Sequence, residues 1–382
     1  MTAPVSSTAL APVPPAAPVQ PLPVPITASG RTGWVAGVVI LAVLLALYLA
    51  VMYGMLLGNV GAVVAAIVAL VPLAVVVIVV LRVDRWEPEP RRLLWFAGLW
   101  GAIGAMALTQ LYLYAFGTAD EWARIVIQAP ILEEITKAVG VFLIFLFARR
   151  FFDGPVDGLV YGGLIGAGFA FTENIQYFGD ALAGGGLGGL GFSFFLRGLL
   201  SPFVHVIATG LTGLALGLAV RHGLPRGSCL IWGSVGLVAA IMFHGLWNWT
   251  ALVELQAFLF GVYPFLQVPL FAVFVVGVVY LLRKEQQTTA ARLTEYANVG
   301  WFTPEEVTML STPKGRREAL RWAAAQPGDR RPAMRKMISA GTGLASARQR
   351  ALSGRDPLAA TVDEPAFLQA IVAARAEVLR PS

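Results

Sequence analysis

Cysteine is almost absent from this chain of 382 residues, and charged side chains are scarce. The single cysteine, Cys229, excludes an internal disulfide. Only 13% of the residues are charged while 57% are hydrophobic, whereas about 25% charged residues is usual in soluble domains. This composition excludes an ordinary soluble globular protein and favours a chain that lies mostly in a lipid bilayer.

Charge is also missing from the beginning of the chain, where Arg31 is the first acidic or basic residue. Residues 1–33 are rich in Pro, Ala, Val and Ser, a composition that cannot form a packed core. They lack the charged start and the short apolar core of a signal peptide. We therefore expect residues 1–33 to form a disordered cytoplasmic tail.

Long apolar runs fill the chain from residue 34 to residue 282. About eight of them approach the roughly 20 residues that a membrane-spanning helix needs: 34–57, 60–81, 93–116, 123–148, 159–178, 192–220, 229–253 and 265–282. The pattern predicts an all-α, polytopic transmembrane helix bundle.

The chain becomes polar after Leu282, and residues 283–382 are expected to form a small, partly helical cytoplasmic region. Thr303, Pro304 and Glu306 have the pattern of a helix N-cap with a capping box. Further short helices are expected at residues 314–326 and about 364–379. No catalytic constellation occurs here, which favours a solvated basic appendage that contacts anionic lipid or a partner.

Among the loops of the predicted bundle, only alternate ones contain Lys or Arg, and further basic residues follow the last span. The basic residues of these loops and those directly after the last span are Arg82, Arg85, Arg91, Arg92, Arg149, Arg150, Arg221, Arg226, Arg283 and Lys284. By the positive-inside rule both termini face the cytoplasm, and a bacterial cytoplasmic membrane is the expected location. The net charge of +6 thus reports orientation, and we expect no nucleic-acid partner.

Charged residues inside the apolar runs are the strongest functional signal. Each costs roughly 2.5 to 3.5 kcal/mol at the bilayer centre, so such groups normally face a wet or protein-lined interior. Glu133 and Lys137 are four residues apart and share a helix face, while Glu134 is rotated by about 100°. One glutamate can therefore neutralise the lysine while the other faces elsewhere. A purely structural ion pair would explain the same pattern.

A second polar pair, Glu173 and Asn174, lies in another span. No Lys or Arg occurs within a turn of Glu173, so its charge must be met by another helix, a water, a metal or protonation. Gly158, Gly162 and Gly166 form a ridge of small residues that lets another backbone approach closely. This ridge by itself indicates only packing.

The histidines His205 and His244 lie in two further spans. Asn248 follows His244 by one helical turn, so the two side chains project from the same face. His205 alone is equally well explained as a satisfied core residue. From the span ends, both histidines and the glutamates lie roughly 9 to 20 Å below the outer boundary, and this common depth favours one site.

Several hydrolytic chemistries can be eliminated. The chain has no His-Glu-x-x-His zinc motif, no Gly-x-Ser-x-Gly nucleophile elbow and no pair of intramembrane aspartates. Glutamate as base remains, with histidine and asparagine as partners, with or without a metal.

These motifs resemble those of PrsW-type intramembrane proteases, relatives of the CAAX-processing and bacteriocin-processing endopeptidases. The resemblance covers roughly residues 90 to 255 and rests on four short motifs in the expected order. They are Glu133-Glu134-x-x-Lys137, Phe169-x-x-x-Glu173-Asn174, an intramembrane His205, and His244-x-x-x-Asn248.

The resemblance implies a membrane-embedded metalloendopeptidase that acts on membrane-anchored proteins such as anti-sigma factors. Glu133 or Glu134 would activate the attacking water, and His244 and Asn248 would stabilise the oxyanion. Glu173 would be a second base or a ligand, because the CAAX branch has histidine there.

If a metal such as zinc is bound, Glu173, His205 and His244 are the expected ligands. Lys137 and Asn174 would support the site.

Two other classes of function stay open. A transporter would also place charges at mid-depth, although no internal repeat or pair of broken helices is visible. A non-catalytic membrane scaffold would explain the glycine ridge and the ion pair.

Overall fold

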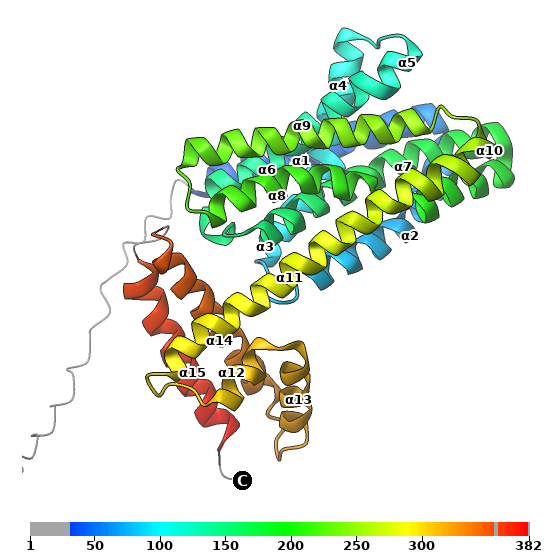
Figure 1. The fold of residues 1–382 in the computed structure, drawn as a ribbon. Coiled ribbons are helices and arrows are strands. Elements are labelled where there is room, and N and C mark those ends of the chain that lie inside the picture. Colours follow the sequence, from blue (N-terminus) through cyan, green and yellow to red (C-terminus); the bar gives the residue numbers. More distant parts are fainter. Residues whose placement is uncertain (1–30, 355–357, 381–382) are drawn as a thin grey trace, which may run out of the picture. The chain divides into compact units, whose positions relative to one another are not determined.

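The computed structural model describes residues 31–354 and 358–380, with side chains from residue 38 onward, and consists of helices without strands in that part of the chain (Figure 1). The predicted all-α class is confirmed. The chain divides into two units, residues 1–43 and residues 44–382. Most of the tail predicted for residues 1–33 lies outside the described residues.

The membrane-type helices alternate regular α-helix with short π-helical turns, labelled η. They are α1 (Arg31–Leu57), α2 (Asn59–Val83), α3 (Arg91–Leu99), η1 (Trp100–Ala105), α4 (Met106–Phe116), α5 (Glu121–Ala123), η2 (Arg124–Gln128), α6 (Ala129–Phe147), α7 (Pro155–Phe194), η4 (Phe195–Leu200), α8 (Val204–Arg221), α9 (Arg226–Thr250), α10 (Leu255–Ala257), η5 (Phe258–Gln267) and α11 (Val268–Ala297). A short 3₁₀ turn, η3 (Arg149–Phe151), joins α6 to α7.

Six helical stretches in the described part are long and apolar enough to cross a membrane. One of them, Pro155–Arg221, is 67 residues long, far more than the roughly 17 to 25 residues of one crossing. It contains α7, η4 and α8, and its helical path is broken at Gly186, where φ is 58°. The predicted loop 179–191 is thus mostly helical. Helix α6, which has 19 residues, is not among these six stretches. It carries three charged residues, Glu133, Glu134 and Lys137, and is therefore less apolar than the other long helices.

Helices α7 and α8 form the buried centre of this bundle and touch through glycine. A Cβ atom on Gly158 would lie 2.0 Å from the backbone oxygen of Gly213, and one on Gly166 would lie 2.2 Å from that of His205. Neither position has room for a side chain. The predicted glycine ridge therefore packs against α8, and this contact sets how closely the two backbones approach.

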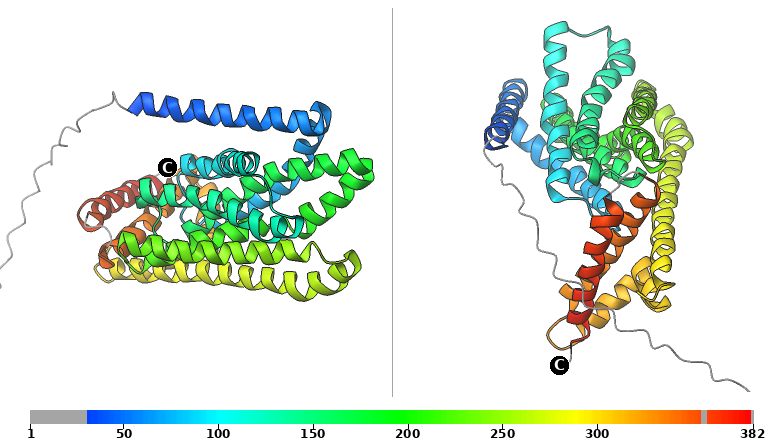
Figure 2. Two further views of the ribbon diagram at one scale, coloured as in Figure 1. Left: turned by 90° about the horizontal axis from the view of Figure 1, so that it is seen from above. Right: turned by 90° about the vertical axis from the view of Figure 1, so that its left-hand side faces the viewer.

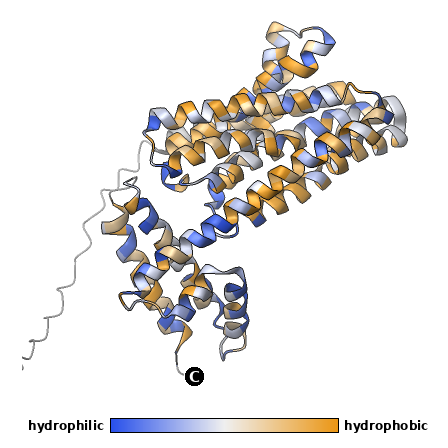
Figure 3. Ribbon diagram, viewed as in Figure 1, coloured by the Kyte–Doolittle hydropathy of each residue, from blue (hydrophilic) through white to orange (hydrophobic). Residues whose placement is uncertain are grey.

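The outer surface of the bundle is apolar. Ile231, Met242 and Val276 are each at least 66% exposed, and Figure 3 shows that hydrophobic residues cover the long helices. Figure 2 shows α9 running beside α8, on which it packs. Exposed apolar side chains of this extent are stable in contact with lipid but not with water. This exterior fits a membrane protein.

The polar C-terminal region folds into five further helical segments. They are α12 (Pro304–Ser311), α13 (Pro313–Ala324), α14 (Arg331–Leu352), η6 (Ala359–Asp363) and α15 (Glu364–Val378). The capping box at Thr303 and Glu306 is confirmed, because the Thr303 hydroxyl accepts from Glu306 N and the Glu306 carboxylate accepts from Thr303 N. The long helix α14 was not predicted.

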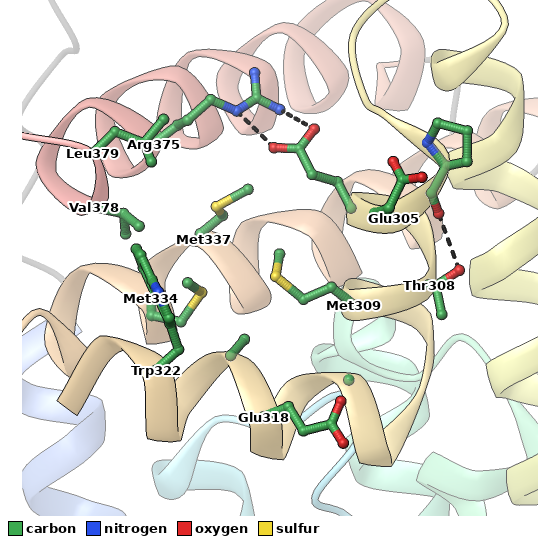
Figure 4. Close-up of a pocket in the computed structure, with 14 residues that line it drawn as sticks. Glu305, Thr308, Met309, Glu318, Trp322, Met334, Met337, Arg375, Val378 and Leu379 are labelled. Carbon is green, nitrogen blue, oxygen red and sulfur yellow. Dashed lines mark hydrogen bonds and ion pairs between the residues drawn. The ribbon is translucent and has the colours of Figure 1, made fainter. Parts of the chain in front are cut away.

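A groove of about 630 Å³ opens on these C-terminal helices (Figure 4). Met309, Met334, Met337 and Trp322 line it, and Arg375 of α15 is bound to the Glu306 carboxylate beside it. It contains none of the residues singled out by the intramembrane motifs.

The basic connections of the bundle meet the C-terminal helices at one end. Trp86, between α2 and α3, donates to the Thr289 hydroxyl at 3.1 Å, and Arg316 stacks on its ring at 3.5 Å. Arg350 donates to Asp153, between α6 and α7, at 2.9 Å. These contacts link α14 and α13 to two of the loops predicted to be cytoplasmic.

Candidate functional site

The site is built around Lys137 of α6, which is completely buried. Its Nζ lies 2.8 Å from Glu134 Oε1 and 3.2 Å from Glu133 Oε2. It also lies 3.9 Å from the centroid of the Phe169 ring on α7, which adds a cation–π contact. A lone buried ammonium would be very costly, and both glutamates, rather than one of them, supply the opposite charge beside Lys137.

Glu134 is fully engaged by protein groups. Its Oε1 accepts from Lys137 and lies 2.9 Å from His244 Nδ1 on α9, and its Oε2 accepts from the Thr209 hydroxyl on α8 at 2.9 Å. The side chain has no exposed surface. Glu134 thus ties α6 to α8 and α9, and both of its oxygens are occupied by these bonds.

The protonation pattern of His205 follows from its neighbours. Lys137 Nζ, which can only donate, lies 2.9 Å from His205 Nδ1. Nδ1 therefore accepts, the ring proton is on Nε2, and Nε2 donates to Glu173 Oε2 at 2.9 Å. His205 connects the Lys137 centre on α6 with Glu173 on α7.

Glu173 receives its countercharge from Arg197 in η4. The Arg197 Nη2 is bound to Glu173 Oε2, and its Nε donates to Asn174 Oδ1 at 2.7 Å. Of the four ways in which the charge of Glu173 could be met, the structure shows a cation from another helical segment. From its place near the end of an apolar run, Arg197 would be expected to extend outward to the membrane surface. This expectation is wrong, because its guanidinium turns to the two polar neighbours on α7.

His244 and Asn248 project from the same face of α9, as their spacing predicted. Since the Glu134 carboxylate can only accept, His244 Nδ1 carries the proton and Nε2 keeps a lone pair. Asn248 Nδ2 donates to the backbone oxygen of Ile125 at 3.0 Å. Ile125 lies in the π-helical turn η2, where irregular backbone leaves such an acceptor within reach.

Three ligand-type atoms converge on one point in the described part of the chain. Glu133 Oε2 lies 3.9 Å from His205 Nδ1 and 3.8 Å from His244 Nε2, and one ligand atom of each of the three residues lies within 4.8 Å of the others. Both histidines direct their remaining ring N–H to a carboxylate. This arrangement is typical of metal-bound histidines, which are oriented by a second carboxylate.

The donor set fits a divalent metal in type, because two histidines and one carboxylate form many catalytic zinc sites. It differs from the predicted set in one member, since Glu133 and not Glu173 joins the two histidines. The ammonium of Lys137 lies 2.9 Å from His205 Nδ1. A metal at this point would therefore require Lys137 to turn away toward Glu134.

A small cavity of about 50 Å³ opens beside this cluster. Glu173, Arg197, His205 and Asn248 line it together with Trp247. Residues of the motifs on α7, α8 and α9 therefore face the same cavity. Arg197 was not among the predicted site residues, although it is the one Lys or Arg between residues 151 and 220.

The comparisons with known proteins concern the same part of the chain. Residues 89–278 match the sequence model described as "PrsW family intramembrane metalloprotease". This part of the chain belongs to the PrsW family. It contains all of the intramembrane residues discussed above, so the PrsW resemblance read from four short motifs is confirmed.

Two similar proteins carry the name "Protease PrsW". The one from Geobacillus kaustophilus (strain HTA426) is 28% identical over 174 residues, which are 45% of this chain and 72% of that protein. The one from Bacillus subtilis (strain 168) is 29% identical over 140 residues, which are 37% of this chain and 59% of that protein. No solved structure matches. The match with the PrsW model and these two relatives indicate a protease. The long apolar helices of the described residues are those of a polytopic membrane protein.

Proposed function

We propose that this PrsW-family protein is an intramembrane endopeptidase that hydrolyses peptide bonds of membrane-anchored proteins, with regulators of the anti-sigma-factor type as candidate substrates. The observation that carries the proposal is the unequal bonding of the two neighbouring glutamates. Glu134 is bound by Lys137, His244 and Thr209, whereas Glu133 is hydrogen-bonded only through Lys137 among the described side chains.

Glu133 is the proposed base. Its Oε2 faces His244 Nε2 across 3.8 Å, too long for a hydrogen bond. A water between two acceptors can donate a proton to each of them, and the carboxylate then removes one proton as the water attacks the substrate carbonyl. Glu134 holds the His244 ring in the tautomer that presents its lone pair to this water.

Asn248 and Arg197 are the proposed groups that stabilise the negative charge on the attacked carbonyl oxygen. Asn248 uses one amide N–H for Ile125 and keeps a second one, and both side chains line the 50 Å³ cavity. The oxyanion role predicted for His244 requires an additional proton on Nε2. We therefore assign this role to Asn248 first.

In the alternative mechanism with a divalent metal, Glu133, His205 and His244 would hold the ion, and Glu133 would be a ligand instead of the base. When bound, such an ion lowers the pKa of water and polarises the carbonyl. Glu134 and Glu173 would orient the two histidines by accepting their remaining N–H groups.

We also propose the arrangement in the cell. Residues 34–282 form the protease-like bundle in the cytoplasmic membrane, with both termini cytoplasmic, and residues 283–382 form a cytoplasmic helical region. The alternation of arginines supports this orientation. Reporter fusions after Arg150 and after Gly185 should report opposite sides of the membrane, and the same side for both would contradict it.

The test is cleavage of single-span peptides by the purified full-length protein in lipid bilayers. Glu133→Gln should reduce the rate by about 10²–10⁴-fold, while Glu121→Gln, at an exposed position, should leave it unchanged. Correct folding is checked by thermal melting. Full activity of a folded Glu133→Gln protein would overturn the assignment, and absence of cleavage by the wild type would favour a scaffold or transporter.

The presence of a metal is tested by measuring the metal content of the purified protein rather than its activity. About one zinc per chain is expected in the protein purified without chelator, and His205→Ala and His244→Ala should lose it. His222→Ala is the matched control, because His222 is an exposed histidine outside the cluster. A metal-free wild-type protein that cleaves peptides would support the hydrolysis without the ion.

A further inference from the structure

A second cavity, of about 150 Å³, lies beside the candidate active site. It is bounded by the break between η4 and α8, by Trp247 of α9 and by the junction of η5 and α11. Its walls are mainly apolar, with Leu200, Phe203 and Phe271 among them. An apolar cavity of about this size is large enough to hold a benzene ring.

This cavity adjoins the catalytic one. Ser201, Pro202, Val204 and Trp247 line both spaces. Val204 directly precedes His205, and Trp247 directly precedes Asn248. Residues 201–203 are not helical, and irregular backbone at membrane depth is tolerated where it lines a cavity. A peptide held at the cluster would therefore pass along this wall.

One side chain that lines the second cavity is hydrogen-bonded through only one of its two polar atoms. Gln267, at the end of η5, is only 2% exposed. Its Nε2 donates to the Thr250 hydroxyl at 2.6 Å, and that hydroxyl in turn donates to the backbone oxygen of Trp247 at 2.6 Å. Because the single proton of Thr250 is used on Trp247, the Gln267 amide cannot be reversed.

The fixed amide leaves Gln267 Oε1 with no donor among the described residues. Buried acceptors nearly always have a donor, and an exception needs an explanation. The residue lies within an otherwise apolar membrane segment, where a polar side chain is expensive and usually functional. Both facts indicate that a ligand group supplies the missing N–H or O–H.

We propose that this cavity is a substrate side-chain subsite and that Gln267 Oε1 accepts a hydrogen bond from the hydroxyl of a tyrosine close to the cleaved bond. The inference rests on the proposed endopeptidase function. Tyrosine combines one apolar ring with a hydroxyl that needs a partner when buried. Serine and threonine would leave the apolar walls unfilled, and the two rings of tryptophan exceed a space of this size.

The experiment uses single-span peptides that differ in one residue. Tyr, Phe, Leu or Ala is placed in turn at each of three positions on either side of the cleaved bond, and kcat/KM is measured with the full-length protein in bilayers. At one position Tyr should exceed Phe by about tenfold or more, because a site built to bind a hydroxyl rejects the analogue that lacks it. Equal rates for Tyr and Phe at every position would overturn the subsite.

Gln267→Leu should bring the ratio of Tyr to Phe at that position to about one or below. Gln110→Leu is the matched control, since Gln110 lies in α4 and lines neither cavity. An unchanged ratio of Tyr to Phe in a folded Gln267→Leu protein overturns the proposal. An equal loss of kcat/KM on Tyr and Phe peptides also overturns it, because Gln267 would then bind the substrate backbone and not the tyrosine hydroxyl. If Gln267→Leu does not fold, the wild-type ratio alone decides. No cleavage of any peptide would overturn both the subsite and the protease function.

Discussion

His244 Nδ1 lies 2.9 Å from Glu134 Oε1, and this bond leaves His244 Nε2 facing Glu133. Two adjacent glutamates of one helix are thereby given different surroundings. Glu134 serves as the orienting partner of a histidine, whereas Glu133 faces the converging ligand atoms. The separation arises because neighbouring residues of an α-helix point about 100° apart.

Thr209 should contribute to stability through its bond to Glu134. Thr209→Val leaves a buried carboxylate oxygen without its donor, which should lower the free energy of unfolding by about 1 to 3 kcal/mol. Thr212→Val is a matched control on the same helix, because the buried Thr212 hydroxyl has no partner among the described residues. Equal unfolding free energies of the two variants, measured in detergent, would contradict the prediction.

Gly166 should tolerate no side chain. Gly166→Ala places a Cβ atom 2.2 Å from the backbone oxygen of His205, so α8 must shift and both stability and cleavage should fall. Gly184→Ala, in the same helix, meets nothing within 4 Å and should gain up to about 1 kcal/mol from helix propensity. Thermal melting of both proteins provides the comparison, and a Gly166→Ala protein as stable as wild type would refute the prediction.

Arg197 should not be replaceable by lysine. Its guanidinium binds Glu173 through Nη2 and Asn174 through Nε, a planar two-point contact that an ammonium cannot reproduce. We expect Arg197→Lys to lower kcat/KM by about tenfold or more without loss of folding. Arg226→Lys, at an exposed position, should have no effect. Wild-type activity of Arg197→Lys would exclude a role for the fork geometry.

Stability should fall as the pH rises from about 4.5 to 8. Burial raises the pKa of Glu89 to about 8 and those of Asp84 and Glu87 to about 7. The folded state thus binds more protons than the unfolded state in this interval. The stabilisation by these protons is complete only below about pH 3.8, the ordinary pKa of Asp84, and is lost as the pH passes 8.

Glu89→Gln tests this pH dependence. The amide oxygen can still accept from Tyr161, the partner of Glu89, but it no longer ionises. Melting temperatures from pH 5 to 9 should therefore decline less steeply than in the wild type. Glu318→Gln, an exposed change, should leave the slope unaltered. A slope for Glu89→Gln as steep as that of the wild type would show that Glu89 does not contribute.

Much of this architecture could be predicted from the sequence because membranes restrict what a chain can do. Apolar run length predicted the helices, and the cost of burying Glu133, Glu173 and His244 indicated that they face inward. Spacing of four residues placed His244 and Asn248 on one face. The PrsW resemblance then supplied the class of chemistry.

Other features depend on contacts between distant segments, which periodicity does not report. Glu134 could not be distinguished from Glu133 until the positions of Thr209 and His244 were known. Arg197 could not be assigned to the site because its partner Glu173 lies 24 positions away in the sequence. Helix α14 was missed because its many small and polar residues give a weak apolar pattern, although it packs in the core of the C-terminal region.

The glycine contact between α7 and α8 also determines which parts of the site can move. If one of these helices slid along the other, their backbone atoms would clash. Glu173 on α7 and His205 on α8 should therefore keep a constant separation. Glu133 lies on α6 and His244 lies on α9, and neither helix belongs to this tightly packed pair. If α6 or α9 moved so that a peptide could enter between Glu133 and His244, the catalytic atoms would separate, and the return movement would bring them together again. Entry of substrate and readiness for hydrolysis would then be coupled steps of a single movement.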